Sequence, residues 1–106
     1  MPLSMIAETI VSQMGGRNRL TAMTGAKYAE IADGYGVQII LPDDLETKNG
    51  VNRVDISLNT RTDTYDMVFN RLEDSGKIVQ VYSTDDIYAD NLQSVFSRHT
   101  GLATHL

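Results

Sequence analysis

The chain of 106 residues contains no cysteine and only two histidines. The missing cysteines exclude disulfides, thiolate metal sites and cysteine nucleophiles, so stability must come from burial and hydrogen bonding. The histidines, His99 and His105, lie near the C-terminus and outside any recognisable catalytic motif. Nucleophilic catalysis needs a nucleophile, a base and an orienting group in one place, and the sequence supplies no such set.

Long hydrophobic runs are also absent. No stretch approaches the roughly 20 apolar residues that span a bilayer. The N-terminal segment, MPLSMIAETIVSQMGG, has no basic leader, and Glu8, Ser12 and Gln13 interrupt its apolar residues, unlike a secretory signal. We therefore expect a soluble, cytoplasmic protein without a membrane partner.

Positive charge is scarce, because nine Lys and Arg residues stand against 14 Asp and Glu residues, for a formal net charge of −5. Three of the cations, Arg17, Arg19 and Lys27, lie in the first 27 residues, where Glu8 is the single acidic residue. A conventional nucleic-acid binder needs a basic face that releases counterions from phosphates. The acidic remainder of the chain therefore argues against direct nucleic-acid binding.

Motifs for cofactors and metals are missing as well. The stretches GGRNRL and MTGAK place glycine near a cation, but neither has P-loop spacing, since Ala26 separates Gly25 from Lys27. The 43–50 loop lacks the ligand pattern of a calcium site. Paired carboxylates fall in or beside predicted turns and caps, where aspartate serves local hydrogen bonding. We expect no cofactor, no metal and no enzymatic activity.

The composition is that of an ordinary globular protein, with 42% hydrophobic and 22% charged residues. A length of 106 residues is typical of one domain and leaves no room for a second core. We therefore expect residues 1–106 to form a single domain.

Two helices are predicted, one near each end of the chain. The first begins at its cap, Ser4, and ends at Gly15; one side of it carries Ile6, Ile10 and Met14. The second begins at residues 84–86, whose side-chain oxygens suit the free amides of a first helical turn, and ends at Gly101. Its predicted apolar stripe comprises Tyr88, Leu92, Val95, Phe96 and His99.

The segment 52–82 contains three alternating apolar runs separated by two short turns. A four-residue loop at 60–63 pairs the first two runs, bringing Val54, Ile56 and Leu58 opposite Phe69, Met67 and Tyr65. The turn at 74–76 pairs the next two runs, bringing Glu73 opposite Lys77 and Phe69 opposite Val81. In this register Val68 lies beside Tyr82 on the opposite face.

Further strands are predicted at 20–24 and 37–41, while 26–36 fits either a helical turn or an irregular strand. Two helices that flank four or five antiparallel strands predict an α+β fold. Both helices, one N-terminal and one C-terminal, are expected to pack on one face of the sheet. The second face of the sheet then stays open.

Two surfaces are candidate binding sites, although each also fits ordinary solvated surface. The open sheet face has the small apolar centre and polar rim of a modest protein interface. Its predicted members are Asp55, Ser57, Asp66, Val68, Asn70, Gln80 and Tyr82. The second surface is an acidic rim formed by Asp85, Asp86 and Asp90, which Asp43, Asp44 and Glu46 could extend.

The chain contains AMTGAK at 22–27, NGVNRVDISLN at 49–59, DTYDM at 63–67, IYADNLQSVF at 87–96 and TGL at 100–102. In these stretches it resembles a group of small proteins encoded by prophages and integrative mobile elements. With the small size and acidic balance, the resemblance implies a non-enzymatic binding protein that occupies a host protein or a protein–nucleic-acid complex. An inhibitor of the anti-CRISPR or anti-restriction type needs complementarity rather than chemistry. Nucleic-acid mimicry by the acidic rim is one version of this hypothesis.

An alternative hypothesis is a nucleic-acid-binding accessory factor of mobile-element transfer or replication. It would use Arg17, Arg19 and Lys27 as a small basic patch. About three phosphate contacts would give weak binding with a shallow salt dependence. A homodimer formed through the open sheet face is a further arrangement that the sequence allows.

Overall fold

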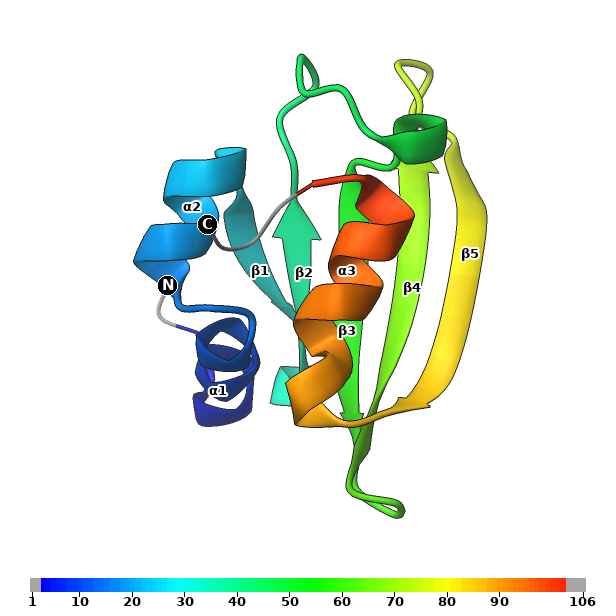
Figure 1. Ribbon diagram of the computed structural model, residues 1–106. Coiled ribbons are helices and arrows are strands. Elements are labelled where there is room, and N and C mark those ends of the chain that lie inside the picture. The colour runs from blue at the N-terminus through cyan, green and yellow to red at the C-terminus, as the bar shows by residue number, and fades with distance from the viewer. Residues whose placement is uncertain (1–2, 103–106) are drawn as a thin grey trace.

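The computed structural model describes residues 3–102, which form three α-helices and five β-strands (Figure 1). The helices are α1 (Met5–Gln13), α2 (Arg17–Thr24) and α3 (Leu92–Thr100). The strands are β1 (Lys27–Ile31), β2 (Gly36–Ile40), β3 (Arg53–Asn59), β4 (Thr64–Leu72) and β5 (Ile78–Ile87). Short 3-10 turns form η1 (Ala32–Gly34), η2 (Lys48–Gly50) and η3 (Ala89–Asn91).

The strands form one antiparallel sheet in the order β1-β2-β3-β4-β5, so each strand pairs with the next along the chain. The three helices lie on one face of this sheet, with α3 over its centre and α1 and α2 on the side of β1 (Figure 1). This arrangement confirms the predicted α+β fold. It contains one N-terminal helix more than the sequence indicated.

The core lies between the helices and the sheet. The predicted register of β3 with β4 is confirmed, because Val54, Ile56 and Leu58 lie opposite Phe69, Met67 and Tyr65. Phe69 is fully buried and belongs to the same core cluster as Leu92 and Phe96 of α3. Since side chains alternate along a strand, this register places the polar residues of β3 and β4 on the other face.

The predicted strand at 20–24 is wrong, because Arg17–Thr24 form helix α2. Leu20 and Thr24 are its buried residues, and the Thr24 hydroxyl donates to the Leu20 carbonyl at 2.7 Å. Gly25 ends the helix in the left-handed conformation, with φ of 74°. A run of five residues is too short for its apolar spacing to separate a strand from a helical turn.

The ambiguous connection at 26–36 contains β1 and the turn η1. Strand β1 pairs with β2 from Lys27 opposite Ile40 to Ile31 opposite Gly36. Asp33 turns the chain in the left-handed region, with φ of 53°, which aspartate tolerates better than most residues. The segment therefore contains both alternatives, a strand at Lys27–Ile31 and a 3-10 turn at Ala32–Gly34.

The predicted start of the C-terminal helix is wrong. Asp85 and Asp86 belong to β5, and α3 begins only at Leu92, after η3. The strand continues because Ile87 is buried opposite Tyr65 on the helix side of the sheet. Tyr88, which was predicted to lie in the apolar stripe of the helix, is 63% exposed.

The predicted register of β4 with β5 is confirmed from the turn as far as Asn70, which lies opposite Gln80 as expected, and is wrong beyond that point. Glu73 lies opposite Lys77, as predicted, and its amide donates to the Lys77 carbonyl at 2.8 Å. A register shift between Phe69 and Asn70 then places Tyr82, instead of Val81, opposite Phe69. Two residues of β5 stand against one of β4 at this β-bulge, so Tyr82 turns to the helix side.

Candidate functional site

The sheet surface opposite the helices, called the open face below, is the first candidate site. Cross-strand pairing arranges it in rows. The central row consists of Ala29, Gln38, Asp55, Val68 and Ser83. The next row consists of Lys27, Ile40, Arg53, Asn70 and Gln80. Six of the predicted members, Asp55, Ser57, Asp66, Val68, Asn70 and Gln80, therefore lie on the open face.

The centre of the open face is polar with one larger apolar side chain. The Gln38 amide donates to an Asp55 carboxylate oxygen at 3.0 Å, which links β2 to β3. The Gln80 amide donates to the Ser83 hydroxyl at 3.4 Å across the bulge. Val68 lies between these pairs and is half-buried. Such a surface offers hydrogen bonds to a partner and little apolar area.

Tyr82 is a correction to the predicted site, because it lies on the helix side. Its ring stacks on His99 of α3, with centroids 3.9 Å apart, and lies 6.1 Å from the Phe69 ring. Ser83 takes the predicted place of Tyr82 beside Val68. The sequence contains no turn signal at the bulge, so the shift of one residue could not be predicted from it.

Three aspartates of β4 and β5 lie next to one another at one end of the open face, and we call Asp66, Asp85 and Asp86 the acidic corner. Tyr65 pairs with Ile87 and Met67 with Thr84. A second register shift between these pairs leaves two residues of β5, Asp85 and Asp86, opposite Asp66. Asp86 has φ of 57° there. Burial raises the pKa of Asp66 above its ordinary value of 3.8, and the charges of Asp85 and Asp86 add to this effect. A hydrogen bond with the Asp86 backbone partly offsets the rise.

The predicted acidic rim is not continuous. Asp90 is exposed in η3, on the connection that follows β5. Asp43, Asp44 and Glu46 follow β2, at the end of the antiparallel sheet opposite to the end of β5. Figure 1 shows these two ends at the top and bottom of the sheet. The loop at 43–46 therefore does not extend the acidic corner.

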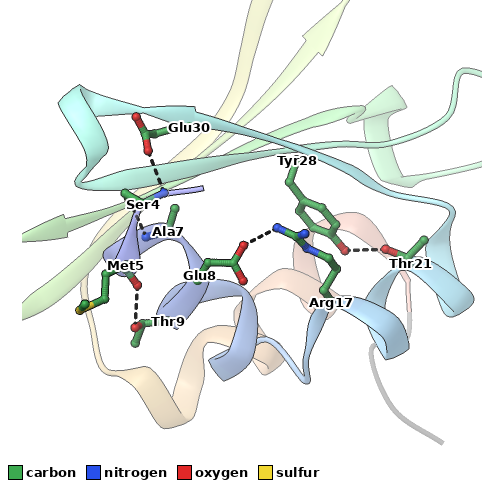
Figure 2. Close-up of polar contacts among 9 residues, drawn as sticks. All are labelled: Ser4, Met5, Ala7, Glu8, Thr9, Arg17, Thr21, Tyr28 and Glu30. Atoms are coloured by element: carbon green, nitrogen blue, oxygen red, sulfur yellow. Dashed lines mark hydrogen bonds and ion pairs between the residues drawn. The ribbon is translucent and has the colours of Figure 1, made fainter. Parts of the chain in front are cut away.

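The predicted basic patch is not assembled either. Arg17 forms an ion pair with Glu8 of α1 and lies over the Tyr28 ring at 5.6 Å from its centroid (Figure 2). Tyr28 also shares a hydrogen bond of 3.1 Å with Thr21, and burial raises its pKa. These contacts lie on the helix side of β1, whereas Lys27 lies on the open face. The arginine is thus occupied in joining α1, α2 and β1.

A cationic corner was missed in the sequence. Lys27 of β1 and Arg53 of β3 flank Ile40 of β2 in one row of the open face. They border a cavity of about 240 Å³ at the ends of these strands. Assigning residues 27–31 as a strand could have revealed this site. Only the pairing of that strand with β2 brings Lys27 close to Arg53.

Within residues 3–102, no three His, Asp or Glu side chains are arranged to hold a metal ion. None of the helices in this part of the chain is long and apolar enough to cross a membrane.

The fold and its site define an α+β protein with one helix-covered face and one open, charge-polarised face. No family model matches the chain, and no curated protein or solved structure matches it either.

Proposed function

We propose that the chain is a small non-enzymatic binding protein whose open face docks on a protein partner, with the acidic corner against basic groups of that partner. The observation that carries this proposal is the juxtaposition of Asp66, Asp85 and Asp86 at one bulge. Like charges held together repel one another, and a cation placed among them relieves that repulsion. Complementary charge also guides the encounter and fixes the register of an interface.

The acidic corner takes part in no ion pair within the described part of the chain, which leaves its charges available to such a partner. Among residues 3–102, the ion pairs are Arg17 with Glu8 and Arg71 with Glu73, and neither involves the corner. Asp85 and Asp86 are exposed, and Asp66 is half-buried beside them. The neighbouring polar row supplies further hydrogen-bonding groups for a partner surface.

We propose a host protein as the partner, on the basis of the resemblance to proteins of prophages and integrative mobile elements. Defence nucleases and their nucleic-acid complexes present basic grooves that bind phosphates. The acidic corner would occupy such a groove in place of phosphate groups. Restriction and CRISPR nucleases are accordingly the first partners to test.

The test compares the wild-type chain with an Asp85→Asn/Asp86→Asn variant, each immobilised and exposed to purified defence nucleases. Asparagine keeps the shape of aspartate and tolerates the left-handed backbone at position 86. The wild type should retain a nuclease at low salt, and the variant should lose at least about tenfold in affinity, which corresponds to about 1.4 kcal/mol.

Asp74→Asn is the matched control, because Asp74 is an exposed carboxylate in the turn between β4 and β5. It removes one negative charge, half the change made in the double variant, far from the acidic corner and should leave the affinity unchanged. Equal retention by the wild type and the double variant would overturn docking through the acidic corner.

A further inference from the structure

The cavity at the cationic corner is distinct from the acidic corner, since the two lie at opposite ends of the open face. Lys27 and Arg53 border it on either side of Ile40. Neighbouring strands are about 4.8 Å apart, so the Cα atoms of the two cations are about 10 Å apart. Both side chains are long enough to reach one ligand between them.

Both cations have capacity to bind a ligand. Neither takes part in an ion pair within the described part of the chain. One guanidinium nitrogen of Arg53 donates to the Asn52 carbonyl at 2.9 Å, which holds the side chain at the rim. A guanidinium carries five N–H donors in a planar fork, so further donors remain for an oxyanion.

The walls of the cavity are fixed by the backbone. Gly25 approaches Pro42 so closely that a Cβ atom at position 25 would lie 3.0 Å from the Pro42 side chain. The Leu41 amide donates to the Asn52 carbonyl at 2.9 Å, which ties the end of β2 to the start of β3. The site is therefore formed before a ligand arrives, which lowers the entropy cost of binding.

The charge and size of the cavity select the ligand. Among residues 3–102, Asp43 is the one carboxylate that borders it, so two cations give this lining a net positive charge in a chain of net charge −5. A phosphate monoester carries about −1.5 to −2 at pH 7. The charge of two cations matches that of this group better than it matches the single charge of a carboxylate. A volume of about 240 Å³ is below the range of about 300–1,000 Å³ typical of larger ligands.

We propose that this cavity binds a phosphate monoester group between Lys27 and Arg53, with the adjoining carbon atoms of the ligand on Ile40 and Pro42. The group belongs either to a small phosphorylated molecule or to a phosphorylated side chain of another protein. This binding is independent of the acidic corner, and its failure would leave the proposed docking function untouched.

The test is a titration of the ¹⁵N-labelled chain, followed by amide chemical shifts at constant ionic strength. Inorganic phosphate should produce saturable shifts around Lys27, Ile40 and Arg53, with a Kd on the order of 1 mM. Arg53→Gln and Lys27→Gln should each weaken binding about tenfold. Asp43→Asn should tighten binding, because it removes a repulsive charge from the rim.

Arg61→Gln is the matched control, since Arg61 is exposed in the turn between β3 and β4, at the other end of the sheet. It should leave the phosphate affinity unchanged. O-phosphoserine and a phosphoserine peptide distinguish the two ligand sources, because a site for a modified protein should bind the peptide more tightly. Shifts that follow ionic strength alone, or that persist in both Arg53→Gln and Lys27→Gln, would overturn the proposal.

Discussion

The imidazole of His99 stacks on the ring of Tyr82, with the centroids 3.9 Å apart and the planes 18° apart. Phe69 completes this cluster, at 5.2 Å from His99 and 6.1 Å from Tyr82. The three rings join α3 to β4 and to the edge strand β5. Tyr82 therefore contributes to stability, although it is 41% exposed.

Tyr82→Ser should lower the free energy of unfolding by about 2 kcal/mol. The aromatic pairs account for about 0.5–1.5 kcal/mol and the lost apolar burial for the remainder. The measurement is urea denaturation followed by circular dichroism. Tyr82→Phe retains the ring and should stay within about 0.5 kcal/mol of the wild type. Equal stability of all three proteins would contradict the stacking.

The stability of the chain should fall as the pH falls through 6.5. Burial lowers the pKa of His99 below its ordinary value of 6.5, and the charges of Arg98 and Lys48 lower it further. Between the two pKa values the unfolded state binds more protons, so the free energy of unfolding decreases as the pH falls. Above pH 6.5 His99 is neutral in both states, and its contribution to stability is fully present.

His99→Phe keeps a ring against Tyr82 and should remove this part of the pH dependence. Denaturation midpoints at several pH values between 5 and 7.5 measure the effect, and an NMR titration of His99 gives its pKa directly. A His99 pKa at or above 6.5 would contradict the prediction.

Asp66→Asn should stabilise the chain at pH 7. The pKa of Asp66 is raised in the folded state. Above pH 3.8 the ionised carboxylate is therefore less favourable in the folded chain than in the unfolded chain, and asparagine removes this cost. Below 3.8 both states are protonated, and the gain should vanish. Urea midpoints at pH 7 and pH 3 test this directly. Asp63→Asn, in the adjacent turn, serves as the comparison.

Gly36→Ala should lower the free energy of unfolding by about 1–3 kcal/mol, the range for an overpacked site. A Cβ atom at this position would lie 2.7 Å from the Ile56 carbonyl oxygen and 3.1 Å from the Ile31 side chain. The carbonyl belongs to the paired strand β3 and cannot move without disturbing the sheet. A denaturation midpoint equal to that of the wild type would show that the strands can separate at this point.

The parts of the fold that the sequence predicted are those specified by strict alternation and a short turn. Val54, Ile56 and Leu58 alternate with polar residues, and a shift by one residue would bury Asp55 and Asp66 instead. The register of β3 and β4 is therefore unique. By contrast, α2 and β1 are short, and alternation alone does not distinguish them; in the folded chain α2 is held by the burial of Leu20 and Thr24.

The candidate site was predicted in part for the same reason. Asp55, Asp66 and Val68 belong to the well-specified pair of strands, and they lie on the open face as expected. Tyr82 and Asp86 follow register shifts in β5, where an extra residue changes the side of every later side chain. Alternation alone cannot locate such shifts, so the stacked tyrosine and the acidic corner required the structure.

The two register shifts in β5 also bear on the behaviour of the chain at high concentration. From Ile78 to Thr84 this edge strand carries no charged residue, and Ile78 is 63% exposed. An uninterrupted edge of this kind would template the addition of strands from other molecules and the growth of fibrils. The bulges divide the edge into short stretches, so we expect an incoming strand to pair with only part of it, which disfavours misassembly without a lysine or a proline between Ile78 and Thr84.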